Sequence, residues 1–233
     1  MTHAPSLKRF HLTLRSLWWS VFPVLLRHLK TTFLVGSRGI WFSGSSCMAP
    51  VSGFYGGSAV SWYAYIIRVA ILMMNHPSKG LLSCLVYHIP SLCASLYVSY
   101  CVFEKNRFMR YLFGIVVPLS CMVAFVNDSV GNGAWWYSLY WLIPVAITLV
   151  MQRHSSRFGI FLASSFIAHA VGSVCWMATH DMTVVQWQML VGCVWYERLM
   201  QTMMLIAVTY VWDYGVAVVA SWRAVLRRGW TIA

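Results

Sequence analysis

Five ionisable side chains interrupt long apolar stretches of this 233-residue sequence, and they are its first candidates for chemistry. They are Arg68, His88, His169, Glu197 and Arg198. A charged group inside a lipid bilayer costs free energy, so such residues usually face a protein interior or a cavity and have a partner there. The chemistry open to them is the recognition of a small solute by charge and hydrogen bonding.

Glu197 and Arg198 are adjacent in an otherwise uncharged stretch between Met182 and Trp212. Consecutive helical residues point about 100° apart, so we expect each to find a partner on another helix. Two interpretations are open. In one, residues 183–196 form an outer re-entrant or interfacial segment, and Glu197 and Gln201 point into a substrate cavity beneath it. In the other, the pair marks the outer end of the last span, with its charged groups at the interface.

A histidine shares one helical face of the segment 158–179 with small residues and a tryptophan. The face carries Ser165, His169, Gly172, Ser173 and Trp176. Small residues let helices approach closely and let hydroxyl groups bond across the interface. His169 is therefore either a residue that contacts a ligand or a packed histidine satisfied by a neighbouring hydroxyl.

Arg68 lies too deep in the segment 57–74 to reach the outer interface easily. Its expected partner is Glu197 or the carboxylate or phosphate of a ligand. His88 precedes Pro90 by two residues and could bond the carbonyl group that the proline leaves without a donor.

Together these residues predict one substrate-binding site, an enclosed polar pocket in the outer half of the membrane. The residues expected to line it are Arg68, His169, Trp176, Trp195, Glu197, Arg198 and Gln201. The sequence has no H-E-x-x-H, G-x-S-x-G, P-loop or Rossmann glycine motif and no Cys-x-x-Cys pair. We therefore expect no catalytic residues, no enzymatic activity, no metal and no cofactor.

The elements that must position these residues are membrane helices, because 60% of the residues are apolar and only 9% are charged. The predicted fold class is all-α, a polytopic membrane protein. Six segments approach the length of roughly 20 residues that a spanning helix needs. They are residues 57–74, 80–103, 111–126, 135–151, 158–179 and 197–220. The third and fourth are short.

The chain divides into three predicted regions. Residues 1–53 hold a basic amphipathic helix from Lys8 to Leu34, which we expect to lie in the membrane interface. The stretch 36–57 is rich in glycine and serine and predicts a loop or a broken element. Residues 54–222 form the six-helix domain, and residues 223–233 form a basic cytoplasmic tail.

Basic residues predict the orientation, because loops on the cytoplasmic side carry the excess of lysine and arginine. Fourteen of the seventeen lie on alternate connections, which places both ends of the chain in the cytoplasm. This explains the net charge of +12 without a nucleic-acid partner and predicts contact with anionic lipid headgroups. A bacterial inner membrane fits best, and a mitochondrial inner membrane is the alternative, because no acidic residue precedes Glu104.

A compact six-helix protein with both ends cytoplasmic, no ATP site and a few inward polar residues resembles the substrate-binding S component of energy-coupling-factor vitamin transporters. The resemblance covers the topology and size of residues 54–222 and implies a role in transport or substrate capture. No site residue of that family is carried over by a motif. The alternative hypothesis is a structural or assembly subunit of a larger membrane complex, with other membrane subunits as partners.

Overall fold

A computed structural model describes residues 48–78, 80–150 and 156–229 of the chain, together with residue 21 and two short strands. The strands β1 (Lys30–Phe33) and β2 (Trp41–Ser43) form an antiparallel pair. The helical elements that follow are α3 (Ala49–Asn75), α4 (Leu81–Val102), α5 (Arg107–Tyr111), the π-helical η2 (Leu112–Val116), α6 (Val117–Asn127), α7 (Ser129–Gly133), the 3-10 helix η3 (Trp135–Trp141), α8 (Leu142–Val150), α9 (Arg157–Met177) and α10 (Val184–Gly229).

Five of the described helices are long and apolar enough to cross a membrane. They are α3, α4, the continuous unit Arg107–Asn127, α9 and the part of α10 from Val184 to Trp222. A sixth apolar helix, Trp135–Val150, is shorter, as predicted. The fold is therefore an all-α integral membrane protein of several spans, which confirms the predicted fold class.

The predicted interfacial helix from Lys8 to Leu34 lies mostly outside the described residues. Where it is described, the prediction was wrong at its end, because residues 30–33 form β1 and pair with β2. This stretch includes two threonines and a phenylalanine, residue types that favour extended backbone.

The first span begins earlier than predicted and is broken near its start. Residues 49–56, expected in a loop or broken element, are helical, and the interruption falls at Gly57 with a φ of 78°. Such a φ favours glycine, which has no Cβ to clash. The helix restarts at Ser58, whose backbone N–H donates to Glu104 Oε1 at 2.8 Å. A carboxylate at a helix start is stabilising, because the N–H groups there lack partners.

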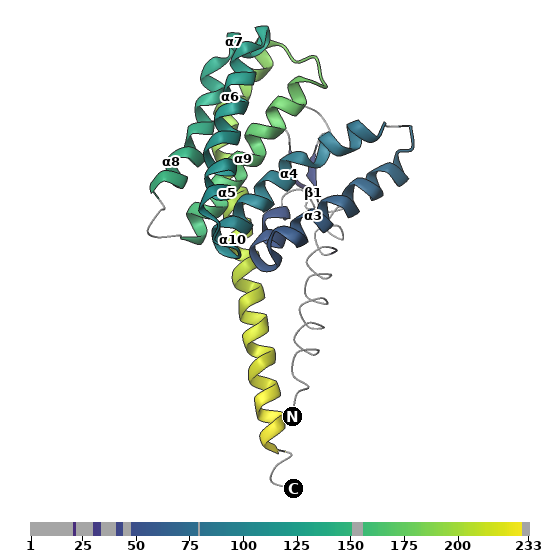
Figure 1. Cartoon of the computed structure of the whole chain (residues 1–233), viewed down its shortest axis with the longest axis vertical. Coiled ribbons are helices and arrows are strands. Elements are labelled where there is room, and N and C mark those ends of the chain that lie inside the picture. Colours follow the sequence, from purple (N-terminus) through teal and green to yellow (C-terminus); the bar gives the residue numbers. More distant parts are fainter. Residues whose placement is uncertain are drawn as a thin grey trace.

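Helices α3 and α4 form a tightly packed antiparallel pair, which Figure 1 shows running obliquely away from the other helices. The Ser95 hydroxyl lies 3.2 Å from that of Ser52 and 2.7 Å from that of Ser61. A Cβ at Gly53 would collide with the Ser95 backbone carbonyl, so glycine is what permits the close approach. Small residues and hydroxyl contacts of this kind join helices where lipid removes the hydrophobic driving force.

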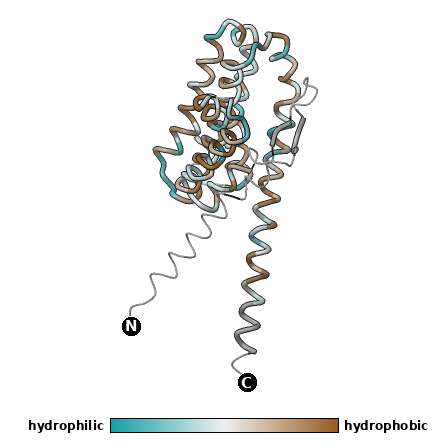
Figure 2. Tube along the Cα trace, turned by 90° about the vertical axis from the view of Figure 1, so that its right-hand side faces the viewer, coloured by the Kyte–Doolittle hydropathy of each residue, from teal (hydrophilic) through white to brown (hydrophobic). Residues whose placement is uncertain are grey.

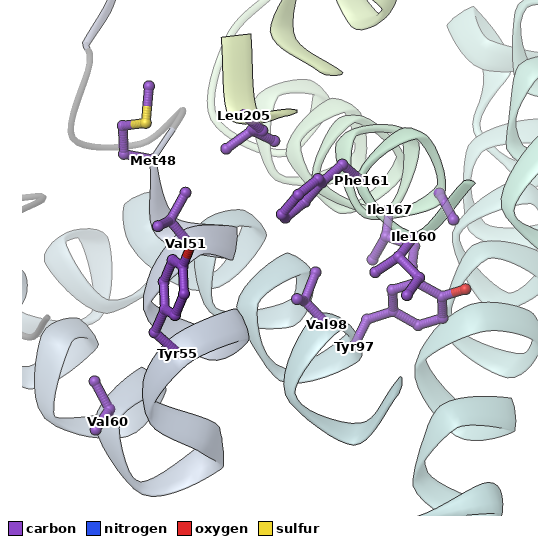
Figure 3. Packing of buried hydrophobic residues seen from close by; sticks show 11 residues of the cluster. Met48, Val51, Tyr55, Val60, Tyr97, Val98, Ile160, Phe161, Ile167 and Leu205 are labelled. Carbon is purple, nitrogen blue, oxygen red and sulfur yellow. The ribbon is translucent and has the colours of Figure 1, made fainter. Parts of the chain in front are cut away.

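Four helices share a buried apolar cluster at the base of the bundle. Figure 3 shows Phe161 of α9 in its middle, with Val51 of α3, Val98 of α4 and Leu205 of α10 around it. A second cluster joins α6, η3, α9 and the start of α10 and includes the buried rings of Phe125, Tyr137, Trp141 and Trp187. Tyr137 of this second cluster contacts His169 of α9.

Helix α10 has 46 residues and is about 70 Å long at about 1.5 Å per residue. This is more than twice the ~30 Å thickness of a hydrocarbon core. Its first part packs in the bundle, and its second part projects beyond it (Figure 1) with largely hydrophobic residues (Figure 2). Residues 223–229, predicted as part of a tail, continue this helix.

Candidate solute site

The polar centre of the bundle is built on one side of α10. The Arg198 guanidinium donates from Nη1 to Gln201 Oε1 at 2.9 Å and from Nη2 to Glu197 Oε2 at 3.4 Å. All three side chains are buried, with relative exposures of 6%, 8% and 9% for Arg198, Gln201 and Glu197. Arg198 is therefore neutralised within its own helix turn.

This arrangement corrects the expectation that Glu197 and Arg198 do not pair with each other. Their Cβ atoms diverge as expected of adjacent helical residues, but the long arginine side chain folds back and reaches the carboxylate. Residues 184–196 belong to one continuous helix with the pair, so they do not form the separate re-entrant segment of the first interpretation. The second interpretation, in which the pair marks the outer end of the last span, stays a prediction.

His169 and Tyr137 complete the centre from α9 and η3. Their rings meet edge to face, with centroids 5.3 Å apart. The Tyr137 hydroxyl lies 3.4 Å from the Ser173 hydroxyl on α9. Both Arg198 and Glu197 lie within electrostatic reach of Tyr137, and Arg198 also lies within reach of His169. We call Tyr137, His169, Glu197, Arg198 and Gln201 the central cluster.

Buried polar atoms of the central cluster that lack a hydrogen-bond partner include Glu197 Oε1 and His169 Nε2. A buried polar atom without a partner costs about 1–3 kcal/mol, and such atoms are uncommon in folded proteins. A carboxylate oxygen accepts hydrogen bonds, and the imidazole nitrogen accepts or donates according to its tautomer. These atoms therefore have unused hydrogen-bonding capacity.

Hydroxyl contacts hold α9 against α10 beside the central cluster. Ser165 on α9 donates to the Arg198 carbonyl at 3.4 Å, and its oxygen lies 3.5 Å from the Thr202 hydroxyl. Thr202 donates to the same carbonyl at 2.7 Å. The predicted small-residue face of α9 thus does carry contacts between helices, and His169 lies one turn beyond Ser165.

The two tryptophans predicted for this site lie elsewhere. Trp176 stacks on His180 with ring centroids 3.7 Å apart, at the end of α9. Trp195 is 53% exposed and packs edge-on against the exposed Tyr196. The first is two helical turns away from His169, and the second faces outward from α10.

Arg68 is also separate from the central cluster. It is 5% exposed and lies between α3 and α4, where His88 is within electrostatic reach. None of the described hydrogen bonds or ion pairs joins Arg68 to Glu197. The structure thus brings together four of the seven predicted site residues, namely His169, Glu197, Arg198 and Gln201.

Sequence reasoning missed Tyr137 and Asp213. Tyr137 follows Trp135 and Trp136, a run typical of interfacial aromatic belts, yet it is 1% exposed and central. Asp213 pairs with Arg157 at 2.7 Å and accepts from the Tyr55 hydroxyl at 2.7 Å, which ties α3, α9 and α10 together. Asp213 interrupts the apolar stretch of the last predicted span, and that interruption was the available signal.

No family model, curated protein or solved structure matches this chain. The fold and the central cluster therefore define its class by themselves: an integral membrane protein of apolar helices with a buried polar centre. Among the described residues, no group of three or more histidine, cysteine or acidic side chains is placed to hold a metal ion.

Proposed function

We propose that this protein is a membrane component for small-solute transport or substrate capture, and that the central cluster holds the solute. The observation that carries this proposal is the presence of two unpartnered buried atoms, Glu197 Oε1 and His169 Nε2, around one buried tyrosine ring. In a bilayer no surrounding water would satisfy them. A bound solute would supply the missing hydrogen bonds.

The charges of the central cluster indicate the kind of solute. Glu197 and Arg198 neutralise each other, so the cluster offers little net attraction to an ion. Glu197 Oε1 requires a donor, and His169 Nε2 requires a donor or an acceptor. The best fit is a small uncharged solute with at least one polar hydrogen for Glu197 and a second polar group for His169, such as an amide, a polyol or a nucleobase. No catalytic step is assigned to the protein.

A second candidate function, a structural or assembly subunit, is favoured by α10. Its described part beyond Asp213 exposes large apolar side chains in several directions, including Tyr214 at 74%, Val219 at 52% and Trp222 at 67%. Because α10 is longer than a bilayer core is thick, a partner subunit could cover part of this surface. This role predicts stable co-purifying subunits and no solute.

The basic residues support an orientation with both ends in the cytoplasm of a bacterial cell. A reporter that fluoresces only in the cytoplasm, fused after Ala233, tests this proposal. Fluorescence is expected. A reporter that is active only on the opposite side of the membrane would contradict the orientation.

The test of the solute site is binding by the purified full-length protein in detergent. Thermal unfolding is measured against a panel of uncharged amides, polyols and nucleobases, and any stabilising compound is then tested for uptake into proteoliposomes. We expect Glu197→Gln to lose at least about tenfold in affinity, because the acceptor loses its charge. The matched control is Asp213→Asn, a carboxylate to amide change on the same helix away from the cluster. Equal loss in both variants, or no stabilising compound, would contradict the proposal.

A further inference from the structure

A second buried polar site lies between α3 and α4, apart from the central cluster. The Ser61 and Ser95 hydroxyls, 2.7 Å apart, fix the register of the antiparallel pair. Seven residues make about two helical turns, which return to the same face. Moving seven residues forward from Ser61 reaches Arg68, and moving seven back from Ser95 reaches His88. Arg68 and His88 therefore lie opposite each other in the interface.

Both side chains are more than nine-tenths buried and incompletely bonded. Arg68 is 5% exposed and His88 is 8% exposed. The buried Arg68 Nε and Nη2 and His88 Nδ1 have no hydrogen-bond partner. The Tyr87 ring packs edge-on against the His88 ring at 5.0 Å and adds an aromatic wall.

None of the acidic side chains neutralises Arg68. All five acidic residues are described, and four of them are engaged elsewhere. Glu104 accepts from Ser58, Asp128 from the start of α7, Glu197 from Arg198, and Asp213 pairs with Arg157. The fifth, Asp181, lies in the exposed connection before α10. A buried guanidinium without a counter-charge carries a desolvation cost that only an anion or deprotonation relieves, and arginine does not deprotonate readily.

We propose that Arg68 and His88 form a binding site for an oxyanion between α3 and α4. The planar guanidinium presents donors in a fork that matches two oxygens of a phosphate or carboxylate. His88 Nδ1 supplies a further donor when it carries a proton. This site is independent of the proposed solute site, because no described hydrogen bond or ion pair joins the two.

The place of the site in the helix pair indicates a phosphate as the oxyanion. Arg68 lies seven residues before the end of α3, and His88 lies seven residues after the start of α4, roughly 10 Å from both ends. The flanking surface is apolar and exposed, with Ile66 at 57%, Leu82 at 74% and Tyr87 at 57%. A lipid whose acyl chains cover this surface could place its phosphate group at Arg68. A free phosphate ion would offer the same oxygens.

The experiment has two arms that separate these sources, and both use the full-length protein delipidated in neutral detergent. In the first arm, dihexanoyl phosphatidylglycerol is titrated and bound lipid is counted by native mass spectrometry. In the second arm, sodium phosphate is titrated at constant ionic strength, and thermal unfolding is followed. Saturable binding in the lipid arm alone identifies a headgroup site. Saturable stabilisation in the phosphate arm identifies a site for the free ion.

In whichever arm binding occurs, Arg68→Gln should weaken it about 10-fold to 100-fold, as expected for lost hydrogen bonds to a charged group. His88→Gln should weaken it less, and Arg68→Lys should give an intermediate loss, because charge is kept without the fork. The control Arg157→Gln removes an arginine that is already paired and should leave binding unchanged. Absence of binding by the unsubstituted protein in both arms, or equal binding by Arg68→Gln, would overturn the proposal. The first outcome does not depend on the folding of any variant.

Discussion

Two arginines, Arg68 and Arg198, are buried in the described part of the chain, and they lie in contrasting surroundings. Arg198 in α10 bonds to Glu197 and Gln201 on its own helix, so its charge is balanced within the chain. Arg68 in α3 faces His88, and no acidic side chain reaches it. In the central cluster, the unpartnered atoms include a carboxylate oxygen, which accepts hydrogen bonds. In the α3–α4 site, they are nitrogens only.

This difference indicates what each site is able to bind. A balanced cluster gains little from an ion and is suited to an uncharged solute that forms hydrogen bonds. An unbalanced guanidinium beside a histidine is suited to an anion. The presence or absence of a nearby carboxylate therefore distinguishes the two arginines, and the two proposed ligands rest on that difference.

The largest expected effect is that of Glu197→Ala. This change leaves Arg198 buried without its counter-charge, which typically costs about 3–5 kcal/mol. We expect a large fall in thermal stability in detergent. The double variant Glu197→Ala with Arg198→Met should recover much of the loss, because no unpaired charge remains. If Glu197→Ala unfolds at the same temperature as the unsubstituted protein, Glu197 does not balance the charge of Arg198. The contrast with Arg68 would then be wrong.

The next effect is expected for Gly53→Val, which acts on the other region alone. The new Cβ would meet the Ser95 carbonyl, a backbone atom that cannot rotate away, and overpacking of this kind costs about 1–3 kcal/mol. Thermal unfolding should show this loss. Oxyanion binding should weaken as α3 and α4 separate, while solute binding in the central cluster should remain. Equal losses at both sites would mean that they are not independent.

A smaller effect is expected for Asp213→Asn, which loosens the connection between α3, α9 and α10. The Arg157 and Asp213 side chains are 35% and 39% exposed, so solvent screens their ion pair, and the hydrogen bond from Tyr55 contributes a similar amount. We expect a loss of about 1 kcal/mol in unfolding measurements. A loss as large as that of Glu197→Ala would show that the Arg157–Asp213 ion pair contributes as much to stability as the buried Glu197–Arg198 pair.

The smallest effect is expected for Gly192→Ala in α10. A Cβ at this position meets nothing within 4 Å, so no neighbour has to move. Alanine is favoured over glycine inside a helix by about 0.5–1 kcal/mol. Unfolding should occur at an equal or slightly higher temperature, in contrast to Gly53→Val. A clear destabilisation would indicate that this face of α10 is covered in the folded protein.

The sequence predicted the helices better than their ends. Apolar length and low charge were enough to find all six segments, because a bilayer requires both. The start of α10 was missed because Glu197 and Arg198 suggested a boundary, whereas their mutual pairing lets the helix continue through them. The helix start after Gly57 is capped by Glu104, which is 46 residues from Ser58 in the sequence, so no local pattern could reveal this contact.

The candidate site was predicted in part for a similar reason. His169, Glu197 and Gln201 were identified because polar residues in apolar stretches are conspicuous. Their grouping with Tyr137 and not with Arg68 depends on how α3 and η3 pack, which hydropathy does not encode. The register that sets Arg68 opposite His88 became visible only through the Ser61–Ser95 contact.

The most direct test of the contrast between the two arginines is the thermal unfolding of Arg68→Met in neutral detergent, without phosphate or anionic lipid. Methionine is also long and unbranched, and it removes a buried charge that no acidic side chain neutralises. The variant should unfold at or above the temperature of the unsubstituted protein, because replacing uncompensated buried charge by an apolar side chain is neutral or stabilising. A fall as large as that of Glu197→Ala would contradict the account, because it would show that Arg68 has a partner within the protein.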